Sequence, residues 1–273
     1  MNAADRWRSD LLARRIPEPI LDAAPESPYG FPAELFRRRA EHAGVAEPTP
    51  TSVRTLEALP PEGTVLDVGV GGGATSLPSA GRASRITGVD AQADMLKAFA
   101  SAARAAGVDA DVIQGAWPDV ATEAPVCDVA VCGHVLYNTT EIEPFVMSLH
   151  EHARNRVVVE LTERHPIAWM ADLWQRFHGL TWPEGPTADD GLEAIRDLGF
   201  DARSERRVSP GDRGGGGFER RQDAIALVRR RLCLPAERDD QIAQALGGRL
   251  REHEGRWSTG PPEQAVVTMW WDV

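Results

Sequence analysis

A run of glycines between two apolar segments constrains the fold of this chain more than any other feature. The run, Gly69 to Gly73, follows the apolar segment Thr64–Val68, and a second apolar segment, beginning at Ser84, ends in Asp90. Glycines at such a place let the backbone turn tightly and approach a ligand closely, because no Cβ is in the way. A strand, a glycine-rich turn, a helix and a second strand ending in an acid form a parallel α/β unit. The sequence therefore predicts a binding site at the carboxyl edge of a parallel sheet.

The same alternation of short apolar runs and helix-length segments continues along the chain. Further strands are predicted at 110–114, 126–132, 156–161, 201–208 and 265–271. Helices are predicted at 75–81, 93–106, 142–153 and 187–198. Strands that alternate with helices indicate a mainly parallel α/β sheet that is covered on both faces, the doubly wound arrangement.

Three segments do not fit this alternation and are predicted to be additions to the sheet. Residues 1–60 are helical in pattern but interrupted by prolines, and we expect an N-terminal helical lid; residues 61–273 would form the main domain. Residues 162–186 form one insertion, whose aromatic residues either line a substrate pocket or pack in a core: Trp169, Trp174, Phe177 and Trp182. Residues 210–262 form a second insertion. Its arginines alternate with acids in two predicted helices, 220–232 and 236–250, which is typical of a salt-bridged helical hairpin.

Composition excludes several classes of protein. With 42% hydrophobic and 26% charged residues the chain is predicted to be a soluble globule, and its net charge of −11 disfavours nucleic acid as a partner. Three unpaired cysteines match neither a disulfide framework nor a metal-binding pattern, so we expect no metal. The first twenty residues lack an apolar run typical of a signal peptide, and no segment has the length of a membrane helix. We therefore expect a cytoplasmic protein with no membrane partner.

The glycine pattern alone does not identify the bound nucleotide, since Gly69-x-Gly71-x-x-Ala74 also fits the dinucleotide fingerprint. Asp67 argues against a dinucleotide, because its carboxylate would face a negative pyrophosphate group. A carboxylate there suits an ammonium group instead, and Asp90 suits the hydroxyls of a ribose. S-adenosylmethionine carries a nucleoside at one end and an α-ammonium group at the other. It is the cofactor that this combination of residues favours.

The stretch Asp67-x-Gly69-x-Gly71-x-Gly73, with Gly88-Val89-Asp90 and Met95 after it, resembles the class I S-adenosylmethionine-dependent methyltransferases. The resemblance covers residues 63–163 and implies a seven-stranded, mainly parallel, Rossmann-like sheet. It also implies that S-adenosylmethionine is bound by Asp67, Gly69, Gly71, Gly73, Asp90, Ala91, Met95, Gly115, Ala116, Trp117 and Gly133. Many members have an acid where this chain has Ala116, which suggests that backbone amides and the Trp117 ring hold the adenine. Trp117 as a packing residue is an equal alternative.

Candidate catalytic residues follow the fourth and fifth predicted strands. His134 lies where the family borders cofactor and substrate, and an imidazole is a plausible base for a hydroxyl or amine acceptor. Glu163 and His165 are second candidates, for a base or for a hydrogen bond to the substrate. The Asn-Pro-Pro-Tyr signature of enzymes that methylate planar amides and exocyclic amines is absent after the fourth strand, so those acceptors are disfavoured.

The sequence is therefore interpreted as a methyltransferase of a small, partly apolar metabolite, with O-methylation slightly favoured and a homodimer kept as a candidate assembly. Three alternatives remain at this point. An RNA or protein methyltransferase would dock its partner through the Arg-rich segment 220–256. A nicotinamide-dependent dehydrogenase would use the same glycines. A non-catalytic module would bind S-adenosylmethionine without transferring its methyl group.

Overall fold

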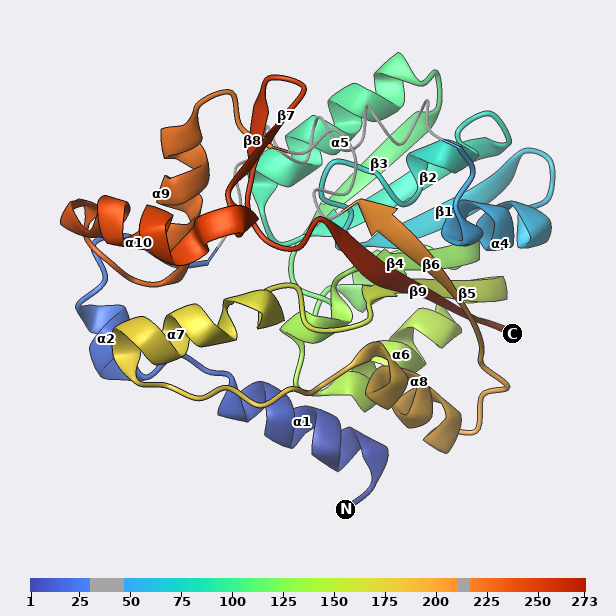
Figure 1. Ribbon diagram of the computed structural model, residues 1–273. Coiled ribbons are helices and arrows are strands. Elements are labelled where there is room, and N and C mark those ends of the chain that lie inside the picture. Colours follow the sequence, from blue (N-terminus) through green and yellow to red (C-terminus); the bar gives the residue numbers. More distant parts are fainter. Residues whose placement is uncertain (30–46, 211–216) are drawn as a thin grey trace.

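A computed structural model describes residues 1–29, 47–210 and 217–273 of the chain (Figure 1). Its centre is a seven-stranded sheet in the order β3-β2-β1-β4-β5-β9-β6. The first five strands of this order are parallel, and β9 runs antiparallel to both of its neighbours. The strands are β1 (Gly63–Val68), β2 (Ala83–Asp90), β3 (Asp109–Gln114), β4 (Cys127–Gly133), β5 (Ala153–Thr162), β6 (Arg203–Pro210) and β9 (Glu263–Asp272). The predicted seven-stranded, mainly parallel α/β fold is confirmed.

The apolar runs form these strands because both faces of the sheet are buried. On one face, α4 (Pro50–Ala58) and α5 (Ala93–Ala105) enclose an apolar cluster that includes Ile86 and Phe99. On the other, α1 (Ala3–Ala13), α6 (Ile142–Glu151) and α8 (Ala188–Asp197) enclose a second cluster, which includes Trp7 and Leu161. Helices on both faces leave the edge at the carboxyl ends of the parallel strands as the place for a ligand.

The helix predicted at 75–81 is not an α-helix. The structure has only a 3₁₀ turn there, η1 (Leu77–Ser79), which is followed directly by β2. Pro78 lacks the amide hydrogen that a continuing helix needs, and the Ser79 hydroxyl donates to the Ser76 carbonyl oxygen (2.6 Å). These residues satisfy their hydrogen bonds locally, so the crossover between β1 and β2 stays a short turn.

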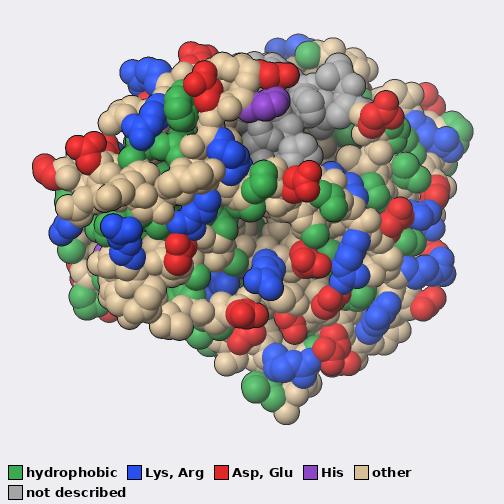
Figure 2. All heavy atoms as spheres, viewed as in Figure 1, with side chains coloured by type: hydrophobic (Ala, Val, Ile, Leu, Met, Phe, Trp, Pro, Cys, Tyr) green, Lys and Arg blue, Asp and Glu red, His purple; other side chains and the backbone are tan. Residues whose placement is uncertain are grey.

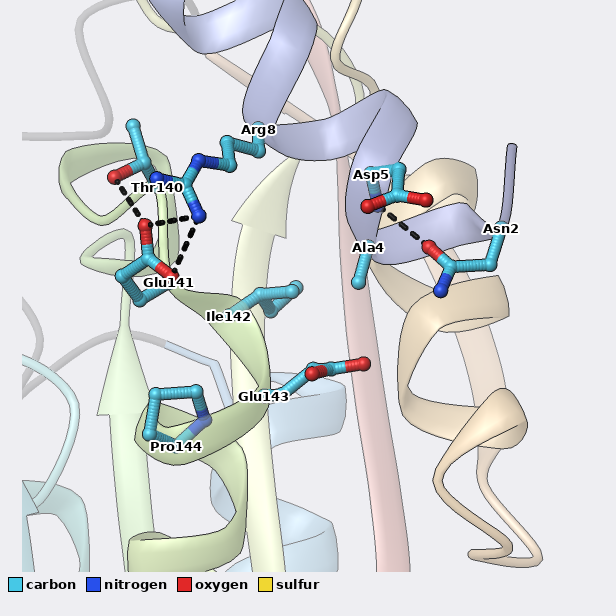
Figure 3. A pocket seen from close by; sticks show the side chains of 9 residues that line it. All are labelled: Asn2, Ala4, Asp5, Arg8, Thr140, Glu141, Ile142, Glu143 and Pro144. Atoms are coloured by element: carbon cyan, nitrogen blue, oxygen red, sulfur yellow. Dashed lines mark hydrogen bonds and ion pairs between the residues drawn. The ribbon is translucent and has the colours of Figure 1, made fainter.

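The N-terminal residues are helical, as predicted, but those described do not form one unit. Helix α1 begins at an Asn2 cap and packs through Trp7, whose ring stacks on Tyr137 (centroids 5.4 Å apart). Arg8 pairs with Glu141 (3.1 Å) beside a small polar hollow of about 80 Å³ (Figure 3). Helix α4 lies on the opposite face of the sheet. Residues 30–46, the middle of the predicted lid, lie outside the described part of the chain.

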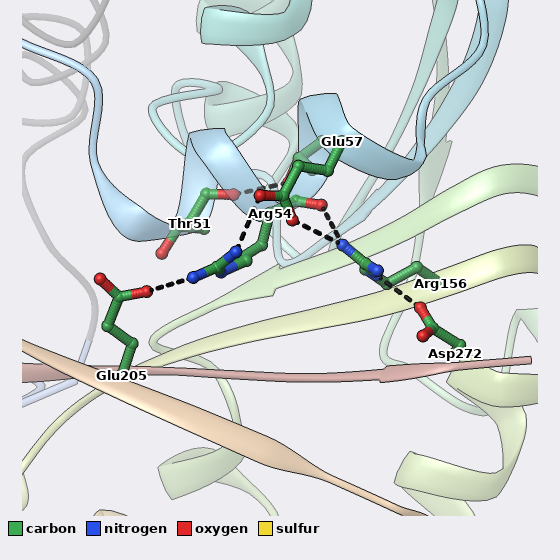
Figure 4. A network of polar contacts seen from close by, with 7 residues as sticks. Thr51, Arg54, Glu57, Arg156, Glu205 and Asp272 are labelled. Atoms are coloured by element: carbon green, nitrogen blue, oxygen red, sulfur yellow. Dashed lines mark hydrogen bonds and ion pairs between the residues drawn. The ribbon is translucent and has the colours of Figure 1, made fainter.

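A chain of ion pairs holds α4 over the sheet (Figure 4). Arg54 contacts Glu57 and, on β6, Glu205, both at 2.8 Å. Arg156 on β5 contacts Glu57 (3.1 Å) and Asp272 on β9 (2.7 Å). Exposed pairs of this kind contribute little stability individually. Their role is to set the position of α4, whose first residues reach the carboxyl edge of the sheet.

The two predicted insertions pack together with α2 (Glu18–Asp22) into a helical cap at one end of the molecule, on the left of Figure 1. We call α2, α7 (Ala171–His178), α9 (Arg221–Arg231) and α10 (Asp239–Leu246) the cap. A third apolar cluster, separate from the two on the sheet, joins these helices. A short hairpin follows, β7 (Arg251–His253) and β8 (Arg256–Ser258). Residues 211–216, at the start of the second insertion, lie outside the described part.

Within residues 1–29, 47–210 and 217–273, no helix is long and apolar enough to cross a membrane. The same residues contain no cluster of His, Cys, Asp and Glu side chains with the arrangement of a metal site.

Candidate active site

A cavity of about 1100 Å³ lies at the carboxyl edge of the sheet, between the sheet and the cap. Most of the residues predicted to bind the cofactor line this cavity: Gly69, Gly71, Asp90, Ala91, Met95, Gly115, Ala116, Trp117 and Gly133. His134 and His165 line it too, whereas Asp67, Gly73 and Glu163 do not. The sheet order explains this convergence, because β1, β2, β3, β4 and β5 all end at this edge.

The glycine loop after β1 forms one wall of the cavity. Gly69 and Gly71 have φ values of 72° and 52°, in the region that favours glycine. A Cβ on Gly69 would lie 2.1 Å from Val135 Cγ2, so only glycine lets the loop pass this close to the segment after β4. Gly73 also has a positive φ (90°), but it faces Leu77 and Phe99 rather than the cavity. Its role is to let the loop pack against α5.

Asp90, at the end of β2, presents an acceptor for ribose hydroxyls. Its Oδ2 accepts from the Gly71 amide (3.0 Å) and its Oδ1 from the Gln92 amide (2.9 Å). These bonds hold the carboxylate at the cavity wall. Each oxygen of an ionised carboxylate can accept a second hydrogen bond. The geometry is therefore suited to two neighbouring hydroxyl groups.

Asp67 lies beneath the loop and does not reach the cavity. Its side chain is completely buried, and neither oxygen accepts a well-formed hydrogen bond from the described residues. Burial raises the pKa of Asp67 to about 7, as does the charge of Asp90, while the nearby Ser76 lowers it in part. The expected direct contact of Asp67 with an ammonium group is thus corrected. Because β1 side chains alternate, residue 67 points to the layer below the loop.

Trp117, after β3, contributes to the cavity wall but is fixed by packing. Its Nε1 donates to the Phe145 carbonyl oxygen (3.3 Å), and its ring meets His152 edge-on, 5.0 Å between centroids. Only 8% of the residue is exposed. The predicted contact of this ring with adenine stays a prediction. Gly115 and Ala116 line the cavity beside it without an acidic side chain, as the sequence indicated.

His134, the first residue after β4, is held against Glu160 of the neighbouring strand. Its φ of 61° is uncommon for a side chain other than glycine, and its amide donates to the Glu160 carbonyl oxygen (2.7 Å). The imidazole Nε2 lies 2.9 Å from Glu160 Oε1. Backbone and side chain therefore both fix the ring at the cavity, and such conformations are concentrated at functional sites.

Glu160 is the functional residue that sequence reasoning did not select. Burial alone would raise its pKa, but the His134 hydrogen bond and charge, Arg207 and the Thr51 hydroxyl together lower the pKa to about 2. Thr51 donates to Oε2 at 2.5 Å and also contacts Thr268 (2.7 Å), and Arg207 lies 3.4 Å from Oε2. An acid inside the apolar run 156–161 was the available signal, because a buried carboxylate needs a partner.

Glu163 does not reach the cavity, so its candidacy as a base or substrate ligand is corrected. Strand β5 ends at Thr162, and Glu163 follows with the opposite orientation to Glu160 and Thr162. Its half-exposed carboxylate lies 3.7 Å from Arg206 on β6. The alternation of side chains along a strand therefore separates the two acids of this segment.

His165 lines the cavity as a neutral ring that is only a weak base. Burial lowers its pKa to about 3, with smaller contributions from the charges of Arg14 and Arg231. Its Nδ1 accepts from the Ile167 amide (3.3 Å), which leaves the proton of the neutral ring on Nε2. His165 therefore offers a hydrogen-bond donor, and its low pKa favours the predicted hydrogen bond to the substrate over the role of a general base.

The aromatic residues of the first insertion divide between two roles. Trp169 and Trp182 line the cavity. Trp174 is fully buried under Trp182, with ring centroids 4.6 Å apart, and Phe177 packs in the same cap cluster. Helical spacing places one face of α7 in the cap core, so only the residues before and after the helix reach the ligand side.

Comparison with known proteins agrees with this geometry. Residues 65–156 match the family model described as a methyltransferase domain. The chain therefore contains a methyltransferase domain of the class I, S-adenosylmethionine-dependent type. The match spans the glycine loop, Asp90 and His134, so S-adenosylmethionine is the cofactor, and the nicotinamide and non-catalytic alternatives are set aside. No curated protein matches the sequence significantly.

Solved structures share the fold of this methyltransferase at low sequence identity. A SAM-dependent methyltransferase from Geobacter sulfurreducens, in complex with S-adenosyl-L-homocysteine, is 16% identical with a TM-score of 0.51, covering 89% of this chain and 99% of that one. One from Thiobacillus denitrificans, in the same complex, is 17% identical with a TM-score of 0.50, covering 90% and 100%. A cyclopropane-fatty-acyl-phospholipid synthase-like protein from Lactobacillus casei is 15% identical, with a TM-score of 0.50 and coverage of 93% and 98%.

The residues at the cavity wall fit S-adenosylmethionine. The glycine loop exposes backbone at close range, Asp90 offers acceptors for the ribose, and Gly115–Trp117 border the place expected for the base. The bound cofactor supplies a methyl group on a sulfonium, which is already activated for transfer. The protein therefore has to position the acceptor, exclude water and, where the acceptor must lose a proton, receive that proton.

Proposed function

We propose that this methyltransferase methylates a hydroxyl group of a small, partly apolar metabolite. The cavity supports this proposal, because about 1100 Å³ exceeds the volume of the cofactor and matches the upper range of small-molecule sites, roughly 1,000 Å³. Its far wall is apolar and aromatic, with Ile167, Trp169, Met170 and Trp182 from the first insertion. A second small molecule can therefore lie between cofactor and cap, away from water.

The observation that carries O-methylation is the contact between His134 and Glu160. Because Glu160 is ionised, it accepts a hydrogen bond from Nε2–H of His134 at 2.9 Å. In the neutral ring, Nδ1 is then the atom that takes up a proton. As the acceptor hydroxyl oxygen gains the methyl group, its proton passes to His134. The imidazolium that forms is stabilised by the Glu160 carboxylate, whose position Thr51 and Arg207 fix.

A macromolecular acceptor has less support. On the face shown in Figure 2, basic and acidic side chains are interspersed rather than gathered into one basic patch. In the Arg-rich segment, Arg220 pairs with Asp223 (2.7 Å), and Arg229 pairs with Asp239 and Glu26 (both 3.3 Å). Arginines that are already neutralised release few counterions on binding RNA. The second insertion is better suited to building the cap than to docking a polyanion.

The acceptor class is tested with S-adenosylmethionine that is labelled in its methyl group. The protein is incubated with the labelled cofactor and a cell extract that has been separated into small molecules, RNA and protein. We expect the label in the small-molecule fraction. NMR of the product should show the labelled methyl group on an oxygen atom. Transfer of the label to RNA or protein instead would overturn the proposal.

The proton acceptor is tested with His134→Gln and Glu160→Gln. General bases contribute about 10²- to 10⁴-fold to rate, so His134→Gln is expected to lower kcat by about 100-fold or more. Affinity for S-adenosylhomocysteine should stay within about twofold, which calorimetry measures. His253→Gln, which removes an exposed imidazole from the β7–β8 hairpin, is the matched control. An unchanged kcat in His134→Gln would exclude His134 as the base.

A further inference from the structure

Arg14 is a buried cation in the wall of the cavity. Only 8% of it is exposed, although arginine is rarely buried without a partner. Its Nε and Nη2 donate to the carbonyl oxygens of Gly185 and Pro183, both at 2.8 Å. Its Nη1 has no acceptor, and none of the described carboxylates forms an ion pair with it. The guanidinium is therefore held firmly by two carbonyl groups, and the charge of Asp10 on the same helix, which acts on it without forming an ion pair, compensates it only in part.

The surroundings of Arg14 are suited to an anion on a planar molecule. The guanidinium carbon lies 5.7 Å from the ring centroid of Trp182, which lines the cavity. His165, in the same wall, offers its Nε2–H as a donor. Arg14 and Arg231 both lower the pKa of His165, so the electrostatic potential at this ring is made positive by two cations. Arg231 itself lines the cavity and is buried enough that its pKa falls to about 10.

The acidic residues that line the cavity form no ion pair with Arg14 in the described part of the chain. Among the described residues they are Glu47, Asp90 and Glu160. Asp90 is bonded to the amides of Gly71 and Gln92 at the end of β2, and Glu160 is bonded to His134 and Thr51. Glu47 precedes α4 and is exposed. None of these three carboxylates is paired with Arg14. Burying a charge is costly unless a partner compensates it.

We propose that the methyl acceptor carries a carboxylate group and that Arg14, with His165 Nε2–H, binds this group. The inference rests on the proposed function, because it describes the acceptor of the same site. The hydroxyl to be methylated lies at the His134 end of the molecule, and the carboxylate lies at the Arg14 end. An arginine and a neutral histidine recognise a carboxylate as two directed donors, whereas an acceptor molecule without an anionic group would leave Nη1 of Arg14 without a charged partner.

The charge of the labelled product tests this proposal without any variant. The small-molecule product of the labelling experiment is applied to an anion exchanger at pH 7 and again at pH 2. A carboxylate is retained at pH 7 and released at pH 2, because its pKa is about 4. Retention at both pH values identifies a phosphate ester or sulfonate and overturns the carboxylate, and release at both excludes an anionic product altogether. Absence of label from the small-molecule fraction is a failure of the proposed function instead.

Variants then test Arg14 itself. The substrate is the unmethylated form of the product that the anion exchanger retains at pH 7. Arg14→Gln is expected to lower kcat/KM about 10- to 100-fold through KM, the scale of a hydrogen bond between charged groups. Arg8→Gln, which removes an equal charge from the outer side of the same helix, should leave kcat/KM unchanged. S-adenosylhomocysteine binding, measured by calorimetry, verifies that each variant is folded. Arg14→Gln with unchanged kcat/KM, or an equal loss in Arg8→Gln, would contradict the assignment.

Discussion

Asp67 and Asp90 end neighbouring strands but experience opposite environments. Asp90 is bonded to two amides at the cavity wall, whereas Asp67 is enclosed beneath the loop with no well-formed hydrogen bond. The parallel register between β1 and β2 places Asp67 beside Gly88, two residues before Asp90. The two carboxylates therefore serve different purposes, and separate variants distinguish them.

Asp90→Ala is expected to weaken binding of S-adenosylmethionine by about 1.5 to 3 kcal/mol, the scale of hydrogen bonds to a charged group. Calorimetric titration measures the loss. Asp94→Ala is the matched control, because Asp94 is exposed at the start of α5 and pairs with Lys97 (3.0 Å) on the surface. An unchanged dissociation constant in folded Asp90→Ala would remove Asp90 from the cofactor site.

Asp67→Asn is expected to stabilise the protein at alkaline pH. The pKa of Asp67 is raised by burial to about 7, above the unfolded value of about 3.9, so the folded state binds this proton more tightly. Its contribution to stability is present below about pH 4 and is lost as pH rises towards 7. Asparagine cannot ionise, so the variant should gain roughly 2 °C or more in Tm at pH 8 relative to the parent protein, and less at pH 5. Thermal unfolding at both pH values measures this difference, with Asp94→Asn as the control. A difference in Tm that does not change with pH would show that Asp67 does not become a buried charged group at alkaline pH.

At the scale of elements, α1 is an integral part of the helical layer rather than a detachable addition. Trp7 is fully buried, stacks on Tyr137 and donates from Nε1 to the Thr139 carbonyl oxygen (2.9 Å). Its partner Tyr137 lines the cavity. The helix therefore connects stability to the shape of the site.

Trp7→Ala is expected to lower the free energy of unfolding by about 3 to 5 kcal/mol, the cost of truncating a buried aromatic residue. Urea unfolding measures it. Leu12→Ala on the same helix is the control, since Leu12 is 39% exposed, and its effect should be under about 1 kcal/mol. Equal losses in both variants would mean that burial of the Trp7 ring is not what holds α1 in place.

At the scale of the whole molecule, the cofactor and the acceptor are held by different parts. The sheet edge carries the glycine loop and Asp90, whereas the cap has its own apolar cluster and carries the aromatic wall. Segments far apart in sequence, near residues 20, 175 and 240, meet in this cluster. Changes in the cap core should therefore affect the acceptor more than the cofactor.

Ile242→Ala tests this division, because Ile242 is fully buried in the cap cluster. The variant is expected to lower kcat/KM for the acceptor at least about tenfold, while S-adenosylhomocysteine affinity stays within about twofold. Gln244→Ala, on the exposed side of α10, should change neither quantity. Parallel losses of acceptor turnover and cofactor affinity would show that cap and sheet edge act as one unit.

The sheet and the cofactor could be predicted from the sequence, because both depend on local patterns. Apolar runs of strand length, the glycine loop and Asp90 are contiguous signals, and the positive φ of Gly69 is a local backbone conformation that favours glycine. The short turn at 77–79 was misjudged, because a single proline and the bond from the Ser79 hydroxyl to the Ser76 carbonyl oxygen outweighed the helical pattern.

The chemistry of the acceptor side depends on contacts between distant segments, which the sequence did not reveal. Glu160 and His134 are 26 residues apart in sequence and become partners because β4 and β5 pair in register. Strand alternation turned Glu163 outward, and burial made His165 a neutral donor. Arg14, from α1, gained its place beside Trp182 only through packing of the cap. Burial and pairing set the charge state of each of these side chains, and both arise only when distant segments meet.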